Sequence, residues 1–152
     1  MHEIERKFRV REVPADRGEG TPIRQGYVAI DEGVSVRVRA RGGTYVLTIK
    51  SGGASRVRTE VEVELDEERF AALWPLTEGR RIEKRRHELV LARHTAELDL
   101  YEGHLDGLAT VEVEFPSEGE ADGFEPPGWF GDELTGLAAW SNASLAVHGL
   151  PE

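Results

Sequence analysis

Strict alternation of aliphatic and charged residues is the feature that most constrains how this chain can fold. In residues 34–41 (VSVRVRAR), aliphatic side chains occupy the even positions and arginines occupy positions 37, 39 and 41. In residues 60–65 (EVEVEL), glutamates alternate with aliphatic residues in the same way. Because successive side chains of a β-strand point to opposite faces, each segment predicts a strand with one apolar and one charged face.

Eight segments have this strand character, and they begin at residues 2, 23, 34, 44, 58, 81, 95 and 109. Short turns such as Gly42-Gly43 and residues 102–107 separate most of them, which predicts antiparallel pairing. Asp66 is a candidate N-cap for a helix from Glu67 to Trp74, and Ser141 is one for a helix through Val147. Another short helical pattern covers Asp132–Leu137.

The charged faces are sorted by sign. Taken singly, each is explained by a one-sided sheet whose charged face meets water. Taken together they need another reason, because like charges at alternate positions repel unless something binds them. We therefore expect an α+β, mainly β fold: a closed eight-stranded antiparallel barrel with its charges inside, its valines outside and helices packed on the outer wall. Eight strands leave room for a small ligand. The acidic pairs are Glu3/Glu5, Glu60/Glu62, Glu97/Asp99 and Glu112/Glu114; the basic pairs are Arg37/Arg39 and Lys84/Arg86, with Lys7 and Lys50 single.

Composition narrows the possible partners. The 152 residues suit one domain spanning residues 1–152. The formal net charge of −10, from 29 acidic and 19 basic residues, argues against nucleic acid or an anionic membrane as a partner. The absence of cysteine, of a signal-peptide pattern and of a long apolar run predicts a cytoplasmic protein. The five histidines show no metal-ligand spacing, and we expect them on the surface.

The alternating charged residues of each strand form a charged row. Taken in order along the chain, these charged rows resemble those of the CYTH family, also called triphosphate tunnel metalloenzymes. The resemblance runs from residue 3 to about residue 115 and implies a tunnel that binds a linear triphosphate with Mg²⁺ or Mn²⁺ and cleaves a phosphoanhydride bond. The chain departs from the family at Lys84-Arg85-Arg86-His87, where Lys-Thr-Arg-Tyr is common, and at Trp140, where tyrosine is common. The matching motifs are Glu3-x-Glu5-x-Lys7, Arg37-x-Arg39, Thr48-x-Lys50, Glu60-x-Glu62, Lys84-x-Arg86, Glu97-x-Asp99 and Glu112-x-Glu114.

The resemblance also implies roles for these residues. Carboxylates would hold the metal, as hard cations prefer, and basic side chains would grip phosphate oxygens. Glu60, Glu62 and Asp99 would bind a second metal ion or position the attacking water. Tyr27 lies where small bacterial members can place a tyrosine near the amino-terminal lysine, and a packed strand tyrosine is an equal alternative. The implied metal ligands are Glu3, Glu5, Glu112 and Glu114, and the implied phosphate ligands are Lys7, Arg37, Arg39, Lys50, Lys84 and Arg86.

The function we expect is metal-dependent hydrolysis of a small-molecule triphosphate, with inorganic tripolyphosphate favoured. Class IV adenylate cyclase and thiamine triphosphatase remain open, because the motifs recognise phosphates and not a base. A non-catalytic polyphosphate- or nucleotide-binding module is a further alternative, although simple anion capture would gain little from so many carboxylates. A homodimer is also an alternative, since the sequence does not identify an interface.

Overall fold

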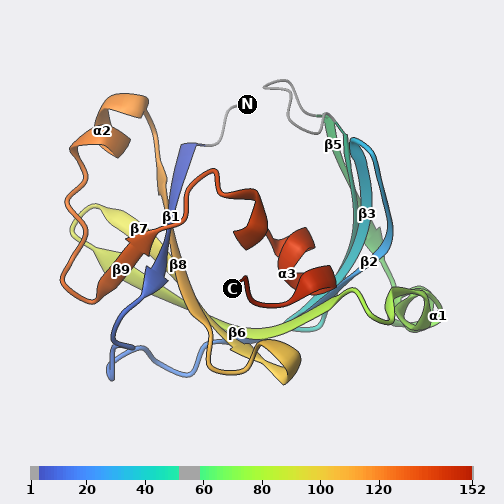
Figure 1. The fold of residues 1–152 in the computed structure, drawn as a ribbon. Coiled ribbons are helices and arrows are strands. Elements are labelled where there is room, and N and C mark those ends of the chain that lie inside the picture. The colour runs from blue at the N-terminus through green and yellow to red at the C-terminus, as the bar shows by residue number, and fades with distance from the viewer. Residues whose placement is uncertain (1–3, 52–58, 152) are drawn as a thin grey trace.

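The computed structural model describes residues 4–51 and 59–151. Its main element is one nine-stranded antiparallel sheet, in the order β5-β4-β3-β2-β6-β7-β8-β1-β9. The sheet curves into an open cup (Figure 1). The strands are β1 (Ile4–Val10), β2 (Thr21–Asp31), β3 (Val34–Arg41), β4 (Thr44–Ser51), β5 (Thr59–Leu65), β6 (Arg81–Leu91), β7 (His94–Glu102), β8 (Ala109–Phe115) and β9 (Phe130–Glu133).

The mainly β, antiparallel architecture is confirmed, but the closed eight-stranded barrel is not. Strands β5 and β9 form the two ends of the sheet, and no hydrogen-bonded ladder joins them within residues 4–51 and 59–151. Helices were expected only on the outer wall. The carboxyl-terminal helix α3 (Asn142–His148) instead lies on the concave side of the sheet, inside the cup (Figure 1).

The predicted helix caps at Asp66 and Ser141 are confirmed. Asp66 accepts a hydrogen bond from the Arg69 amide at 2.7 Å, and Ser141 accepts one from the Ser144 amide at 3.2 Å. The caps begin α1 (Glu67–Leu73) and α3, and a further helix, α2 (Glu118–Gly123), was not predicted. Short 3₁₀ helices are η1 (Trp74–Thr77), η2 (Gly103–Leu105) and η3 (Ala138–Trp140).

The predicted helix over Asp132–Leu137 is wrong. Residues Phe130–Glu133 form β9, which pairs with the free edge of β1. Beyond the strand, the Leu134 amide donates to the Lys7 carbonyl at 2.7 Å, and the Lys7 amide donates to Thr135 Oγ1 at 2.9 Å. The backbone N–H and C=O groups along this edge of β1 thus pair with residues 130–135 as in a sheet. This pairing outweighs the weak helical pattern of the local sequence.

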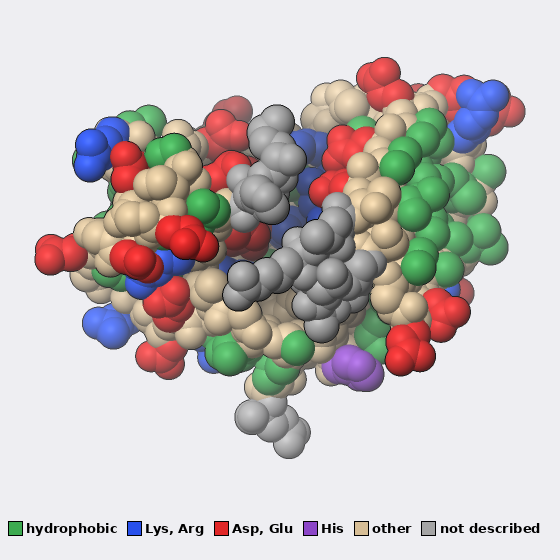
Figure 2. All heavy atoms as spheres, turned by 90° about the horizontal axis from the view of Figure 1, so that it is seen from above, with side chains coloured by type: hydrophobic (Ala, Val, Ile, Leu, Met, Phe, Trp, Pro, Cys, Tyr) green, Lys and Arg blue, Asp and Glu red, His purple; other side chains and the backbone are tan. Residues whose placement is uncertain are grey.

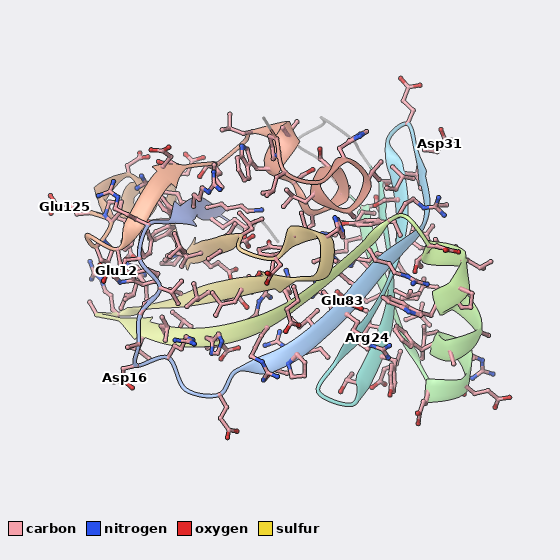
Figure 3. The ribbon with its side chains drawn as sticks, turned by 60° about the horizontal axis from the view of Figure 1, so that its bottom comes forward. Glu12, Asp16, Arg24, Asp31, Glu83 and Glu125 are labelled. Atoms are coloured by element: carbon pink, nitrogen blue, oxygen red, sulfur yellow. The ribbon has the colours of Figure 1, made fainter. Side chains whose placement is uncertain are left out.

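The convex face of the sheet carries one apolar core. Phe8, Val111 and Val113 are buried there beneath α2 and β9, and the Phe8 and Phe130 rings lie 5.0 Å apart. On another part of this face, Arg24 lies beside α1 (Figure 3), with its guanidinium 5.2 Å from the Trp74 ring. With apolar packing on the convex side, the charged rows of most strands are left on the concave side.

A second apolar cluster fills one end of the cup. Leu145 and Ala146 of α3 pack against Tyr27, Ile82 and Tyr101 of the sheet. The strand pairing places Tyr27 opposite Arg37 and Tyr101 opposite Lys84, so these aromatic residues share the concave face with the charged rows. The concave face is therefore apolar at the end covered by α3 and charged elsewhere.

His87 does not lie on the surface as expected. Its side chain is buried on β6, and its Nδ1 lies 3.2 Å from the carbonyl oxygen of Arg17. The connection before β2 approaches closely, since a Cβ on Gly20 would lie 2.6 Å from the histidine ring. In the part of the chain that the structure describes, no helix combines the length and apolar character needed to cross a bilayer.

Candidate active site

A row of arginines on β3 forms the basic wall of the cup. Arg37, Arg39 and Arg41 line a cavity of about 390 Å³ together with Thr48 of β4 and Glu62 of β5. Seen from above, Lys and Arg side chains lie within a hollow that has acidic side chains on both sides (Figure 2). The alternation of residues 34–41 produces this wall, because it directs every second side chain into the cup.

Arg37 and Arg39 are held with little compensation by carboxylates. Arg37 is buried, and its Nε has no hydrogen-bond partner among the described residues. Arg39 donates from Nε to Gln25 Oε1 at 2.8 Å. Burial, together with repulsion from Arg37 and Arg86, lowers the pKa of Arg39 to about 10. The two guanidinium groups are planar hydrogen-bond donors and are suited to binding an anion.

The second basic pair, Lys84 and Arg86, is tied to a buried carboxylate. Asp99 accepts from Lys84 Nζ at 2.8 Å and from Arg86 Nε and Nη2 at 2.8 and 2.9 Å. Arg86 Nη1 also contacts Glu97 at 3.1 Å. Burial opposes ionisation of Asp99, but the two cations lower its pKa to about 2. Burial lowers the pKa of Lys84 to about 8 in spite of Asp99.

Lys7, Tyr27 and Lys50 lie on the concave side but in different surroundings. Lys7 Nζ donates to the Trp140 carbonyl at 2.7 Å and lies 3.9 Å from Glu112, and burial lowers its pKa. Burial raises the pKa of Tyr27, although hydrogen bonding and attraction from Arg37 oppose this shift. Lys50 is half-exposed, with Nζ 4.0 Å from Glu60.

An acidic wall faces the cup from β1, β7 and β8. Strand pairing sets Glu5 opposite Glu114, and Glu97 opposite Glu112. These four carboxylates line a cavity of about 500 Å³. Directly opposed like charges destabilise a sheet unless a cation offsets them. Two such pairs at one cavity are therefore a donor set whose chemistry suits a hard divalent cation.

The carboxylates are not gathered into a finished metal site. Within residues 4–51 and 59–151, no three His, Cys, Asp or Glu side chains are close enough together to hold a metal ion as they stand. Glu3, the remaining predicted ligand, lies outside the described residues. Glu60 and Glu62 are on β5, the end strand of the sheet, and Glu62 borders the basic cavity. Asp99, on β7, is enclosed between Lys84 and Arg86.

Two residues of the site were not predicted from the sequence. Glu97 stood in a recognised motif without an assigned role, yet it contacts Arg86 and lines the acidic cavity. Gln25 lies in the predicted strand segment that begins at residue 23, and it is fully buried and bonded to Arg39. The signal that could have placed it in the site is its position two residues before Tyr27, on the same face of β2.

Comparison with known proteins gives close relatives of this chain. A CYTH domain model matches residues 1–126. The chain is 45% identical over 150 residues to an inorganic triphosphatase of Nitrosomonas europaea, covering 97% of this chain and 98% of the relative. It is 36% identical over 149 residues to an inorganic triphosphatase of Acetivibrio thermocellus, covering 96% of this chain and 94% of the relative.

The fold also matches a solved structure of similar size. A crystal structure of an inorganic triphosphatase superposes with a TM-score of 0.81 at 41% sequence identity, covering 99% of this chain and 98% of that chain. The chain belongs to the CYTH domain family.

Proposed function

We propose that this protein is a divalent-metal-dependent triphosphatase that hydrolyses a phosphoanhydride bond of inorganic tripolyphosphate. The observation that carries the proposal is the arrangement on one concave face, where the arginine row of β3 lies in the same cup as the opposed carboxylates of β1, β7 and β8. The relatives named inorganic triphosphatase, which match almost the whole chain, support this substrate.

The basic wall would bind the triphosphate. Arg37 and Arg39 present planar guanidinium groups, which match phosphate oxygens through paired hydrogen bonds. Lys50, half-exposed on the neighbouring strand, would add a further cation at the same wall. Arg86, which is bonded to both Asp99 and Glu97, would offer its remaining N–H donors to phosphate oxygens between the two walls. Lys84 is fully buried, so its contribution would be the electrostatic field and the position of Asp99.

The acidic wall would hold Mg²⁺ or Mn²⁺ through Glu5, Glu112 and Glu114, joined by Glu3. Carboxylate oxygens are the ligands that these hard cations prefer. When bound there, the ion would offset phosphate charge and make a water molecule a better nucleophile. Lys7, which lies 3.9 Å from Glu112, would stabilise charge at the boundary between metal ligands and phosphate.

The remaining polar residues would orient the reacting groups. Glu62 borders the cavity that the arginines line, and with Glu60 it would position the attacking water or a second metal ion. Asp99 would act by holding Lys84 and Arg86 in place. Tyr27, hydrogen-bonded to Arg37, would fix that guanidinium against the phosphate chain. An in-line displacement requires this kind of positioning more than covalent chemistry from the protein.

The test is a substrate panel with the full chain. Phosphate release from tripolyphosphate, ATP and thiamine triphosphate would be measured with Mg²⁺, with Mn²⁺ and with EDTA. We expect the highest kcat/KM for tripolyphosphate and no turnover in EDTA. Formation of cyclic AMP from ATP, a higher kcat/KM for thiamine triphosphate, or metal-dependent binding without turnover would each replace this proposal with one of the alternatives.

A matched pair of variants tests the acidic wall. Glu114→Gln keeps the shape of the side chain but removes a charge that the metal needs, so we expect kcat to fall by about a hundredfold or more. Glu118→Gln makes the same chemical change on exposed α2, away from the cup, and should leave kcat unchanged. Equal activity of the two variants would remove Glu114 from the metal site.

A further inference from the structure

The cationic groups of the cup differ in how their charge is compensated. Arg86 is bonded to two carboxylates, with Asp99 at 2.8 and 2.9 Å and Glu97 at 3.1 Å. Arg39 has a neutral partner instead, the side-chain amide of Gln25 at 2.8 Å. Among the described residues, no carboxylate lies within ion-pair distance of Arg39. Arg39 therefore keeps its full positive charge, while that of Arg86 is largely offset.

Gln25 is a buried neighbour of Arg39 on the adjacent strand. It lies on β2 directly opposite Arg39 of β3, and it is fully buried. Since an arginine side chain can only donate hydrogen bonds, the atom that faces Nε must be the amide oxygen. This bond uses only Nε of Arg39. The two terminal amino groups make no hydrogen bond to a described residue. Those two groups form the planar fork that suits a phosphate.

The other end of the Gln25 amide is unfavourable for folding. Its Nε2 is buried without a hydrogen-bond partner among the described residues. A buried donor that has lost water and gained no partner destabilises the folded state, so an apolar side chain of similar length would suit this position better on packing grounds. What the amide provides, and an apolar side chain would not, is the acceptor for Arg39.

We propose that Gln25 is a positioning residue for substrate binding: it fixes the Arg39 guanidinium through Nε without neutralising it, and so presents an uncompensated fork to a phosphate group. This inference rests on the proposed triphosphatase function. A carboxylate at position 25 would hold the guanidinium equally well but would cancel its charge, as Asp99 and Glu97 do for Arg86. The neutrality of the amide matters as much as its oxygen.

Two substitutions separate orientation from charge. Gln25→Met removes the acceptor and keeps the volume, so Arg39 loses its orientation. Gln25→Glu keeps the acceptor but neutralises Arg39. For both variants we expect the KM for tripolyphosphate to rise about tenfold or more, the range for losing a hydrogen bond to a charged group, with kcat changed much less. The dissociation constant for tripolyphosphate without metal, measured by titration calorimetry, should rise in parallel.

Gln25→Glu is the decisive variant, because a purely structural role for Gln25 predicts that it binds substrate as well as the wild type. Ile23→Val, a small change at a buried apolar position of the same strand, controls for packing and should leave KM within about twofold. Unchanged KM and binding in Gln25→Glu, or a loss of kcat alone in both variants, would overturn the inference. A wild type that binds tripolyphosphate without hydrolysing it would refute the proposed function instead, and the comparison of dissociation constants would still decide the role of Gln25.

Discussion

At the scale of single residues, Asp99 is the carboxylate on which two cations depend. It is buried and accepts three hydrogen bonds from Lys84 and Arg86. Asp99→Asn leaves Lys84 buried without a counter-charge, and breaking a buried ion pair in this way costs about 3–5 kcal/mol of unfolding free energy. Urea denaturation measures this loss of unfolding free energy. Glu97→Gln, which alters a more exposed partner of Arg86, should cost less than about 1 kcal/mol. Equal costs would show that Asp99 carries no special share of the stability.

The same carboxylate predicts a pH dependence. Lys84 and Arg86 overcome the effect of burial and lower the pKa of Asp99 from 3.8 to about 2. As pH falls below about 4, the unfolded state takes up this proton first, so the stability that Asp99 contributes is lost as pH approaches 2. Below about pH 4, the difference in unfolding free energy between wild type and Asp99→Asn should therefore shrink, by up to about 1.4 kcal/mol per pH unit. A difference that grew on acidification would contradict this assignment.

At the scale of elements, Arg6 connects three segments that are distant in sequence. Its guanidinium donates to Glu133 of β9 at 2.7 and 3.0 Å, and to the carbonyls of Ala121 and Phe124 at 2.8 and 3.1 Å. Arg6→Met keeps an apolar stem but leaves two partly buried carbonyls without their donor, so we expect a loss of about 2–3 kcal/mol in urea unfolding.

The control for Arg6 is Glu133→Gln. It retains an acceptor oxygen in a largely exposed ion pair and should cost less than about 1 kcal/mol. If Glu133→Gln destabilised the protein as much as Arg6→Met, the salt bridge and not the carbonyl contacts would be what holds α2 and β9 to β1.

Arg6 also explains why some elements could be predicted and others not. Strand β3 was predicted with the bounds that the structure has, and β4 with the same first residue, because alternation is a local signal that burial of one face reinforces. Strand β9 and helix α2 have four and six residues and carry no such period. They depend on the free edge of β1 and on the reach of Arg6, neither of which can be read from the local sequence.

At the scale of the whole molecule, the sorted charges predicted which face is concave but not how the sheet ends. The buried Lys84, Arg86 and Asp99 confirm that charged rows turn inward. Closure into a barrel was inferred from the need to enclose these rows, yet α3 enters the cup and encloses part of it instead (Figure 1). Tyr27 and Ile82 form part of the apolar surface at that end. Both lie on the concave side, as Tyr101 does, and all three pack against the helix.

The helix α3 is therefore a structural part of the cup, and Leu145 is its central contact. Leu145 is completely buried against the concave apolar cluster, whereas Val147 on the same helix is 43% exposed. Leu145→Ala should lower the unfolding free energy by about 2–5 kcal/mol, because it leaves a cavity between the helix and the sheet. Val147→Ala should change it by no more than about 0.5 kcal/mol. Urea denaturation of the two variants makes the comparison, and equal small effects would mean that α3 rests only loosely on the sheet.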